Sequence, residues 1–284
     1  MMQALAEFTM RSRLHATGAS MLAAVLPLLG WLSAVIIALA VLRFGSLTGL
    51  LILLWTLLPT SIIFYQAPVG DPSMGVLLVS SFMLAVLLRQ TVSWELVLLA
   101  CVGLTAVIAA LLETTTTMSA LFARYFKVLE QSLGTTIEPA EAMTAFMGIY
   151  ALAIAYLTLA ALVVARWCQG ALYNPGGFGK EFRALRLSPG VSAGVAAVML
   201  VCMLLPEQFG RWLPLVTLPL VFAAIGLAHW LVKTRGLPNH LVAVFYIALV
   251  LLYQLVYPML AAVALVDSWL NIRPKIQTNQ EGNQ

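Results

Sequence analysis

Long apolar runs dominate the chain, and short polar or glycine- and proline-containing stretches separate them. The runs lack the alternation of apolar and polar positions that the strands of a membrane β-barrel show. In lipid, only helices and closed barrels satisfy every backbone hydrogen bond, so the pattern predicts a bundle of membrane-spanning helices. The clear segments are 46–65, 74–89, 92–112, 143–166, 190–206, 211–232 and 239–266.

An earlier apolar run, residues 16–42, is longer than one span requires. As one straight helix it would measure about 40 Å, against a hydrocarbon core of about 30 Å. Pro27 and Gly30 lie at its middle, where a helix would break. The run is either one long crossing or a hairpin of two short helices that turns near Gly30–Trp31. The distribution of charge favours the hairpin.

Basic residues indicate the topology, because cytoplasmic loops of membrane proteins carry an excess of them. The loop at 167–189 and its flank carry four cations, Arg166, Lys180, Arg183 and Arg186. With this loop in the cytoplasm, counting back through the segments places Arg89 and Arg43 there as well. The hairpin brings Arg11 and Arg13 to the same side, so we expect a cytoplasmic N-terminus.

The C-terminal end leaves two arrangements open. A single crossing at 239–266 would put Arg273 and Lys275 outside, whereas a break at Pro258 would return them to the cytoplasm. The charge bias favours a cytoplasmic tail.

Composition agrees with a membrane protein, because 62% of the 284 residues are hydrophobic and only 9% are charged. A soluble domain carries about 25% charged residues. We predict an all-α, polytopic integral-membrane helical bundle with about nine transmembrane helices, in a range of 8–10. It forms a single transmembrane domain over 1–284, with a six-helix part (14–166), a cytoplasmic loop (167–189), additional helices (190–270) and a flexible tail (271–284).

The predicted outer loop, 113–142, contains an amphipathic pattern. Apolar residues recur at helical spacing at Met118, Leu121, Phe122, Tyr125, Phe126, Leu129 and Leu133. Arg124, Lys127 and Glu130 face the other way. We expect a helix that lies on the outer membrane surface, either as a lid over a cavity or, more simply, as a connector.

Groups for catalysis are scarce in the predicted spans. The three histidines form no HExxH pattern, no GxSxG motif occurs, and the three cysteines show no CxxC spacing. Glu95, near the cytoplasmic end, is the only acid well inside a span, which argues against an ion-driven carrier. We therefore expect no enzyme, no metal site and no cofactor, and no nucleic-acid partner for a net charge of +4 spread over many loops.

Neutral polar and aromatic side chains remain within or beside the spans. We name them as candidate ligand-binding residues: Trp55, Thr56, Thr60, Tyr65, Gln66, Tyr150, Tyr156, Tyr253 and Gln254. Such a set suits a small neutral or ring-bearing ligand, held by stacking and a few hydrogen bonds. The alternative is ordinary packing, with each hydroxyl bonded to a neighbouring backbone.

Two features are candidates for docking a protein partner. Ala16, Ser20 and Ala24 recur at four-residue spacing, and small residues in a row let two helices approach closely. Either an intramolecular neighbour or a partner subunit would use this stripe. In the loop, a short amphipathic helix from Phe178 to Pro189 presents the second feature, Phe182 with Arg183 and Arg186. This helix either anchors the loop in the membrane interface or docks a cytoplasmic partner.

The GFGK sequence in this loop is not a nucleotide site. A Walker loop needs Gly five residues before its Gly-Lys pair and Ser or Thr after it. Asn174 occupies the first position here and Glu181 the second.

Four stretches carry a resemblance to a known family: MRSRLHA, LRFGSLTGLLILLWTLLP, ALYNPGGFGKEFRALRLSP and LVDSWLNIRP. Over nearly its whole length the chain resembles the YybS-like family of predicted bacterial membrane proteins, a domain of unknown function. That family is distantly similar to the substrate-capture subunits of energy-coupling-factor vitamin transporters, through the first six helices and a turn with Gly45 and Gly49. The resemblance implies a protein of the bacterial inner membrane.

Two functions fit these expectations. The first is a transport-associated subunit that binds a small neutral or aromatic ligand and has no energy source of its own. The second is a non-transport scaffold, assembly factor or regulator that acts through its cytoplasmic loop. In both, the partners are the lipid bilayer and a membrane or cytoplasmic protein.

Overall fold

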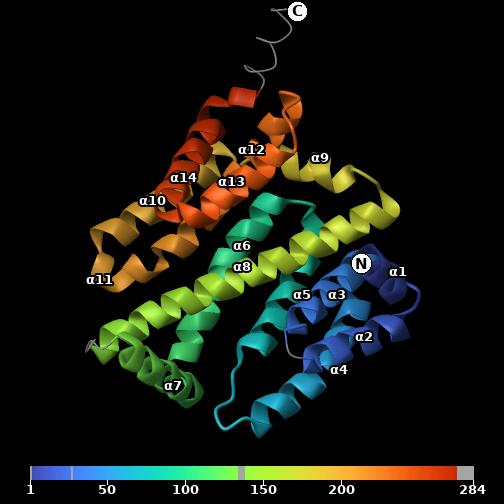
Figure 1. Cartoon of the computed structure of the whole chain (residues 1–284), viewed down its shortest axis with the longest axis vertical. Helices are drawn as coiled ribbons and strands as arrows, with labels where there is room; N and C mark the ends of the chain where they lie inside the picture. Colours follow the sequence, from blue (N-terminus) through green and yellow to red (C-terminus); the bar gives the residue numbers. More distant parts are fainter. Residues whose placement is uncertain (1, 27, 134–137, 274–284) are drawn as a thin grey trace, which may run out of the picture. The chain divides into compact units, whose positions relative to one another are not determined.

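The structure is a computed structural model that describes residues 2–26, 28–133 and 138–273. Within these ranges every regular element is a helix (Figure 1), as the apolar runs predict. The chain forms two compact units, an N-terminal unit (Met1–Phe178) and a C-terminal unit (Gly179–Gln284). The division falls inside 167–189, the segment expected to separate six helices from the additional ones.

Helices of the N-terminal unit follow most of the predicted segments. They are α1 (Met2–Met10), α2 (Arg13–Val25), α3 (Gly30–Phe44), α4 (Ser46–Gln66), α5 (Ser73–Thr91), α6 (Trp94–Glu113), α7 (Thr116–Leu133) and α8 (Pro139–Tyr173). The pattern of apolar runs did not predict α1.

The helix α3 is the core of the N-terminal unit. Every residue from Ser33 to Leu42 is buried, and α2, α4, α5 and α8 pack around this stretch. A helix that is apolar on all sides suits such a position. Gly45, with φ of +105°, ends α3 in a conformation that other residues rarely adopt. Gly49 then lets α4 approach Val41, which a β-carbon at this position would strike.

The run 16–42 is a helical hairpin, as the charge bias predicts. Helix α2 ends at Val25, α3 begins at Gly30, and the two pack on each other, so the turn precedes the predicted Gly30–Trp31. Pro27 lies outside the described residues. Ser33 Oγ donates a hydrogen bond of 2.7 Å to the carbonyl of Ser20 across the hairpin. Both helices are short, with 13 and 15 residues.

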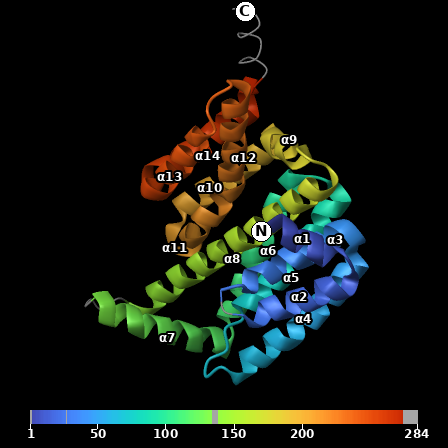
Figure 2. The same ribbon diagram turned by 45° about the vertical axis from the view of Figure 1, so that its right-hand side comes forward.

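Helix α8 is much longer than the predicted segment 143–166. Its 35 residues extend to Tyr173, because nothing breaks the helix before Asn174–Pro175. At about 52 Å it exceeds the hydrocarbon core of about 30 Å. Pro139 opens the helix at a position where a missing N–H costs nothing. Helix α7 lies beside its first turns (Figures 1 and 2).

The C-terminal unit is built around α12. From α9 (Gly177–Ala184), at the boundary, the chain continues through α10 (Pro189–Leu204), α11 (Pro206–Phe209), α12 (Leu213–Thr234), α13 (His240–Leu251) and α14 (Tyr253–Leu270). Residues 215–224 of α12 are all buried, and α10, α13 and α14 pack against this helix. The hydroxyl of Tyr257 donates to the carbonyl of Pro214 and lies 2.8 Å from Thr217 Oγ1, which holds α14 on α12.

The segment 239–266 is not one continuous helix, and its break lies at Leu252 and not at Pro258. It consists of α13 and α14, which lie side by side and meet at Leu252 (Figures 1 and 2). Pro258 is inside α14, where its missing N–H removes one backbone hydrogen bond without ending the helix. Lys275 and the predicted flexible tail beyond Arg273 lie outside the described residues.

Six helices of the described part are long and apolar enough to cross a membrane, so the chain is a multi-pass membrane protein. They are α4, α5, α6, α8, α12 with α11, and α14. A seventh span results if α9 and α10, bent by 61°, count as one. The predicted count of nine is not confirmed, because α2 and α3 are only about 20 and 23 Å long.

Candidate functional site

The candidate ligand-binding residues of α4 lie in two different environments. Thr56 is buried, and its hydroxyl lies 2.8 Å from Ser20 Oγ of α2 and 2.7 Å from the carbonyl of Ile52. Thr60 donates to the carbonyl of Thr56. These hydroxyls therefore serve contacts between and within helices, as the packing alternative expects.

The aromatic candidates of α4 lie on its outer side. Trp55 is 53% exposed, Tyr65 is 83% exposed, and Gln66 is exposed as well. Exposed apolar side chains of a multi-pass membrane protein face lipid or a partner. The structure does not bring Trp55 and Thr56 together.

The remaining candidates belong to both units. In α8, Tyr150 is buried and Tyr156 is half-buried. Tyr253 and Gln254 are exposed at the start of α14, where the Gln254 amide lies 3.5 Å from the Tyr253 hydroxyl. A shared role of all nine residues in ligand binding stays a prediction.

An aromatic pocket lies between α7 and α8, next to the candidate Tyr150. Its volume is about 660 Å³, within the usual range for sites of small molecules. We call it the α7–α8 pocket; Phe122, Tyr125, Phe126, Val128, Ser132, Glu141, Ala142, Ala145, Phe146 and Ile149 line it. The amphipathic pattern predicted the apolar face of α7 but not its contact with α8.

Ring contacts organise this pocket. Phe122 stacks on Phe126 with ring centroids 5.1 Å apart and lies 5.6 Å from Phe146 of α8. Phe146 also contacts Tyr125 at 6.2 Å and Tyr150 at 6.4 Å. These separations are typical of favourable aromatic pairs. The pocket thus offers several ring faces to a ligand that is itself planar and apolar.

The rest of α7 behaves as the amphipathic pattern predicts. Met118 and Leu121 are buried, whereas Arg124 and Lys127 are exposed. The side chains of Leu129 and Leu133 lie outside the described residues. Helix α7 packs against its chain neighbours α6 and α8. Its role as a lid or as a connector stays a prediction.

Arginines gather at the C-terminal end of α3. The Arg89 guanidinium donates to the carbonyls of Val41 and Leu42, at 2.9 and 2.7 Å. Gln169 of α8 also donates to Leu42, and Arg166 donates to Gln169. These donors serve carbonyls that the last turn of a helix leaves free.

A cation–π contact adds another arginine at the same end of α3. The Arg43 guanidinium lies 4.2 Å above the ring of Tyr173, at the end of α8. Three of the arginines assigned to one side of the membrane from sequence therefore share one end of the N-terminal unit.

The predicted amphipathic helix of the loop forms as α9, but it ends at Ala184 and does not continue to Pro189. The chain beyond it packs within the C-terminal unit. Leu185 and Leu187 are buried. The ring of Phe182 contacts His229 of α12 edge-on at 5.6 Å. Gly226 of α12 allows this approach, because a β-carbon there would lie 2.8 Å from the Phe182 carbonyl oxygen. Arg186, expected to point away toward lipid, donates instead to the carbonyl of Ser268 in α14.

Arg273 fastens this segment to the end of α14. Its Nε donates to Asp267 Oδ2 at 3.0 Å, and its Nη1 and Nη2 donate to the carbonyls of Arg183 and Leu185 at 2.6 Å. The side chains of Arg273 and Asp267 are only 11% and 3% exposed. We call this group of contacts the Arg273 clasp. The apolar pattern did not predict this clasp. The sequence feature that indicates it is the acid Asp267 near the apolar end of α14.

The stripe of small residues in α2 faces the interior. Ala16 and Ser20 are fully buried and Ala24 is half-buried, and α2 packs against α3 and α4. Its intramolecular use is therefore visible within the N-terminal unit. Among the described residues, no group of three His, Cys, Asp or Glu side chains could hold a metal ion.

No protein-family model, curated protein or solved structure matches the chain. The resemblance to the YybS-like family stays a prediction from four sequence stretches. Two of these stretches, 171–189 and 265–274, meet in the Arg273 clasp.

Proposed function

We propose that this chain binds a small, neutral, ring-bearing ligand in the α7–α8 pocket, as a transport-associated subunit of the bacterial inner membrane. The aromatic lining of that pocket carries the proposal. Its volume of about 660 Å³ accommodates a molecule of a few fused or linked rings. Each ring that a ligand stacks on adds about 0.5–1.5 kcal/mol to the energy of burial.

Besides the Tyr125 hydroxyl, the polar side chains that line this pocket are Ser132 and Glu141. Glu141 is in the first turn of α8, and Ser132 belongs to the last turn of α7. Ser132 already donates to the carbonyl of Val128 in its own helix. The carboxylate of Glu141 is thus the group that would accept a hydrogen bond from the ligand and orient it.

The orientation of the pocket supports capture from outside the cell. Arg43, Arg89 and Arg166 gather at one end of the N-terminal unit. The positive-inside rule assigns that end to the cytoplasm. We propose that α7 and its pocket lie at the outer side and that the N-terminus is cytoplasmic.

An energy source would have to come from a partner. In the described residues, Asp267 is the buried acid, and Arg273 neutralises it. A carboxylate held in this way is unsuited to carry a proton or a sodium ion through the membrane. We propose a second membrane protein, powered by ATP hydrolysis, as the partner for uptake.

The alternative function, docking through the cytoplasmic loop, loses two of its three candidate residues to internal contacts. Phe182 contacts His229, and Arg186 donates to Ser268. Their side chains stabilise the C-terminal unit itself.

Native mass spectrometry of the full chain, purified gently in detergent, tests the proposed function. We expect a co-purified aromatic molecule on the wild-type protein. Phe126→Ala and Tyr125→Ala should each reduce its occupancy about tenfold, because each removes a ring face of the α7–α8 pocket.

Trp55→Ala is the matched control, because it also removes a large ring but from an exposed position outside this pocket. It should retain wild-type occupancy. Recovery of bilayer lipids alone, or equal loss in the control, would contradict the proposal.

A further inference from the structure

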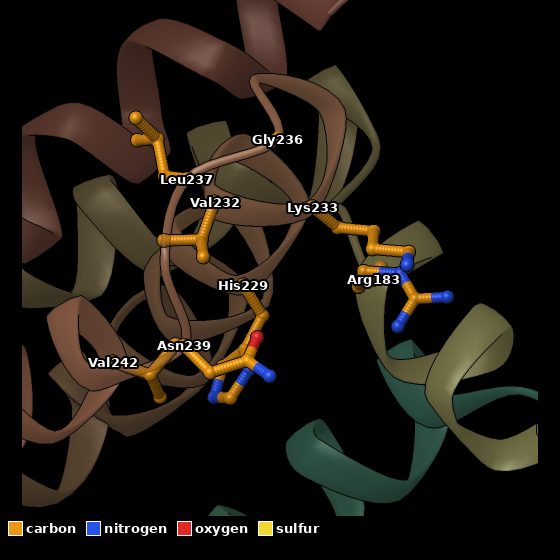
Figure 3. A pocket seen from close by; sticks show the side chains of 8 residues that line it. All are labelled: Arg183, His229, Val232, Lys233, Gly236, Leu237, Asn239 and Val242. Carbon is orange, nitrogen blue, oxygen red and sulfur yellow. The ribbon is translucent and has the colours of Figure 1, made fainter.

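A second pocket lies entirely within the C-terminal unit, where α12 connects to α13. Its volume is about 270 Å³. Arg183, His229, Val232, Lys233, Gly236, Leu237, Asn239 and Val242 line it (Figure 3). We call it the α12–α13 pocket. The proposed ligand site in the other unit shares none of these residues.

Positive charge distinguishes this pocket. Figure 3 shows the side chains of Lys233 and Arg183 reaching toward the same side of it, from α12 and α9. No carboxylate is among the lining residues. The remaining polar side chains are the amide of Asn239 and the imidazole of His229, which pairs with Tyr246 Oη at 3.0 Å.

The partial negative charge at the end of α12 does not neutralise the two cations of this pocket. Lys233 lies in the last turn of α12, where the helix dipole amounts to about half a negative charge. The terminal carbonyls already have partners in their own chain, since Leu237 N donates to Val232 and Arg235 N donates to Leu231. Gly236, with φ of +63°, allows this turn. Two full positive charges therefore exceed what the helix end can neutralise.

Arg183 is held by its backbone, which leaves its side chain available to the pocket. Its carbonyl accepts from Arg273 Nη1 at 2.6 Å. The Arg273 clasp fixes the α9 end against α14 and so positions the Arg183 guanidinium. A guanidinium can donate two parallel hydrogen bonds to the oxygens of a phosphate, and an ammonium adds a compact charge.

The remaining wall of the pocket is apolar. Val232, Leu237 and Val242 form it, and Val242 lies in the first turn of α13, whose residues are largely exposed and apolar. Basic pockets beside apolar helices at the cytoplasmic surface are typical sites for lipid head groups.

From this combination we propose that the α12–α13 pocket binds the phosphate group of a phosphate ester that carries an apolar part. Arg183 and Lys233 contact the phosphate oxygens, and the apolar wall contacts the rest of the molecule. Two sources supply this chemistry, a phospholipid of the bilayer and a soluble phosphorylated metabolite.

Isothermal titration calorimetry of the full chain in a non-ionic detergent tests the site with dihexanoyl phosphatidic acid. We expect binding to the wild-type protein. Arg183→Gln and Lys233→Gln should each weaken it about tenfold or more, because each removes a charged donor to phosphate. Lys233→Arg should retain binding, which separates loss of charge from loss of folding.

Lys180→Gln is the matched control, since Lys180 is exposed on α9 and does not line the pocket. It should change the affinity less than twofold. Equal weakening by this control would show non-specific attraction and overturn the proposal. So would binding of dihexanoylglycerol, which lacks phosphate, as tightly as the phosphatidic acid, or no binding of the phosphatidic acid at all.

Glycerol 3-phosphate distinguishes the two sources. Affinity comparable to that of dihexanoyl phosphatidic acid identifies a soluble phosphate ester as the ligand. Much weaker binding identifies a phospholipid head group, because the apolar wall then contributes. Both results retain the phosphate site.

Discussion

At the scale of single residues, Arg273 joins parts of the C-terminal unit that are far apart in sequence. One guanidinium neutralises the buried Asp267 and donates to two carbonyls at the C-terminal end of α9, those of Arg183 and Leu185. A carboxylate this well buried is stable only with a partner, because its desolvation costs several kcal/mol. The clasp is therefore a structural contact, and it also sets the position of Arg183.

Removing the cation from the clasp should destabilise the protein strongly. We expect Arg273→Ala to lower the free energy of unfolding by about 3–5 kcal/mol, because Asp267 is left charged and buried. The double variant with Asp267→Ala should lose less than the sum of the two single changes, since no charge then remains unpaired. Thermal unfolding in detergent measures both.

Lys180→Ala is the control for this cycle, because Lys180 is an exposed cation on α9. This substitution should change the free energy of unfolding by no more than about 0.5 kcal/mol. Strictly additive losses in the double variant would show that Asp267 and Arg273 do not interact.

Residue types alone predicted the buried hydroxyls but not which aromatic rings come together. Thr56 lies within a helix contact, as small polar residues in membrane bundles do. Trp55, its neighbour in sequence, faces outward, because adjacent residues on a helix point about 100° apart. A set chosen by depth in the membrane does not take this rotation into account, so depth alone does not show which side chains share a face of the helix.

At the scale of helices, the hairpin of α2 and α3 depends on Ser20. Its carbonyl accepts from Ser33, its hydroxyl faces Thr56 of α4, and none of it is exposed. Small residues at this place let three helix backbones approach. The stripe of small residues in α2 therefore serves contacts between helices of the same chain.

A larger residue at this crossing should destabilise the N-terminal unit. We expect Ser20→Leu to lower the free energy of unfolding by about 1–3 kcal/mol, because the added atoms have no space. Gly18→Leu is the control on the same helix, where nothing lies within 4 Å of an added β-carbon. Loss of a co-purified subunit from a fully folded Ser20→Leu protein would instead assign the stripe to a partner.

Some helix ends have a local signal in the sequence, whereas others depend on contacts between distant segments. Ser188 before Pro189 opens α10 as a capping residue does. In contrast, the break at Leu252 has no breaker residue of its own, and α14 is fixed on α12 by Tyr257. Such a contact between distant segments leaves no periodic trace in the sequence.

At the scale of the whole molecule, apolar runs predicted the class of protein but not which of the helices are long enough to span a membrane. A run shows that a segment avoids water and does not show whether lipid or protein surrounds it. Helix α3 is enclosed by other helices, and its 15 residues are too few to cross the core of a bilayer alone. The hairpin nevertheless returns the chain to the side from which it entered.

The arrangement of the N-terminal unit leads to a defined labelling pattern. Glu7 of α1 and Ser119 of α7 are both exposed, and α2 to α6 lie between them. With α2 and α3 as a hairpin and α4, α5 and α6 as three spans, we expect these residues on opposite sides of the membrane. From the arginines at the end of α3, the positive-inside rule predicts that the Glu7 side is cytoplasmic. The native cysteines Cys101, Cys168 and Cys202 are buried and should add little background.

We therefore expect a membrane-impermeant maleimide to label Ser119→Cys in intact cells. Glu7→Cys should react only after the membrane is permeabilised. Acidic residues contribute little to orientation, so replacing Glu7 should leave the topology unchanged. Labelling of both positions in intact cells would contradict the odd number of crossings between them. Labelling of Glu7→Cys alone in intact cells would show that the orientation is the reverse of the one proposed. The α7–α8 pocket would then face the cytoplasm, where it could not capture a ligand from outside.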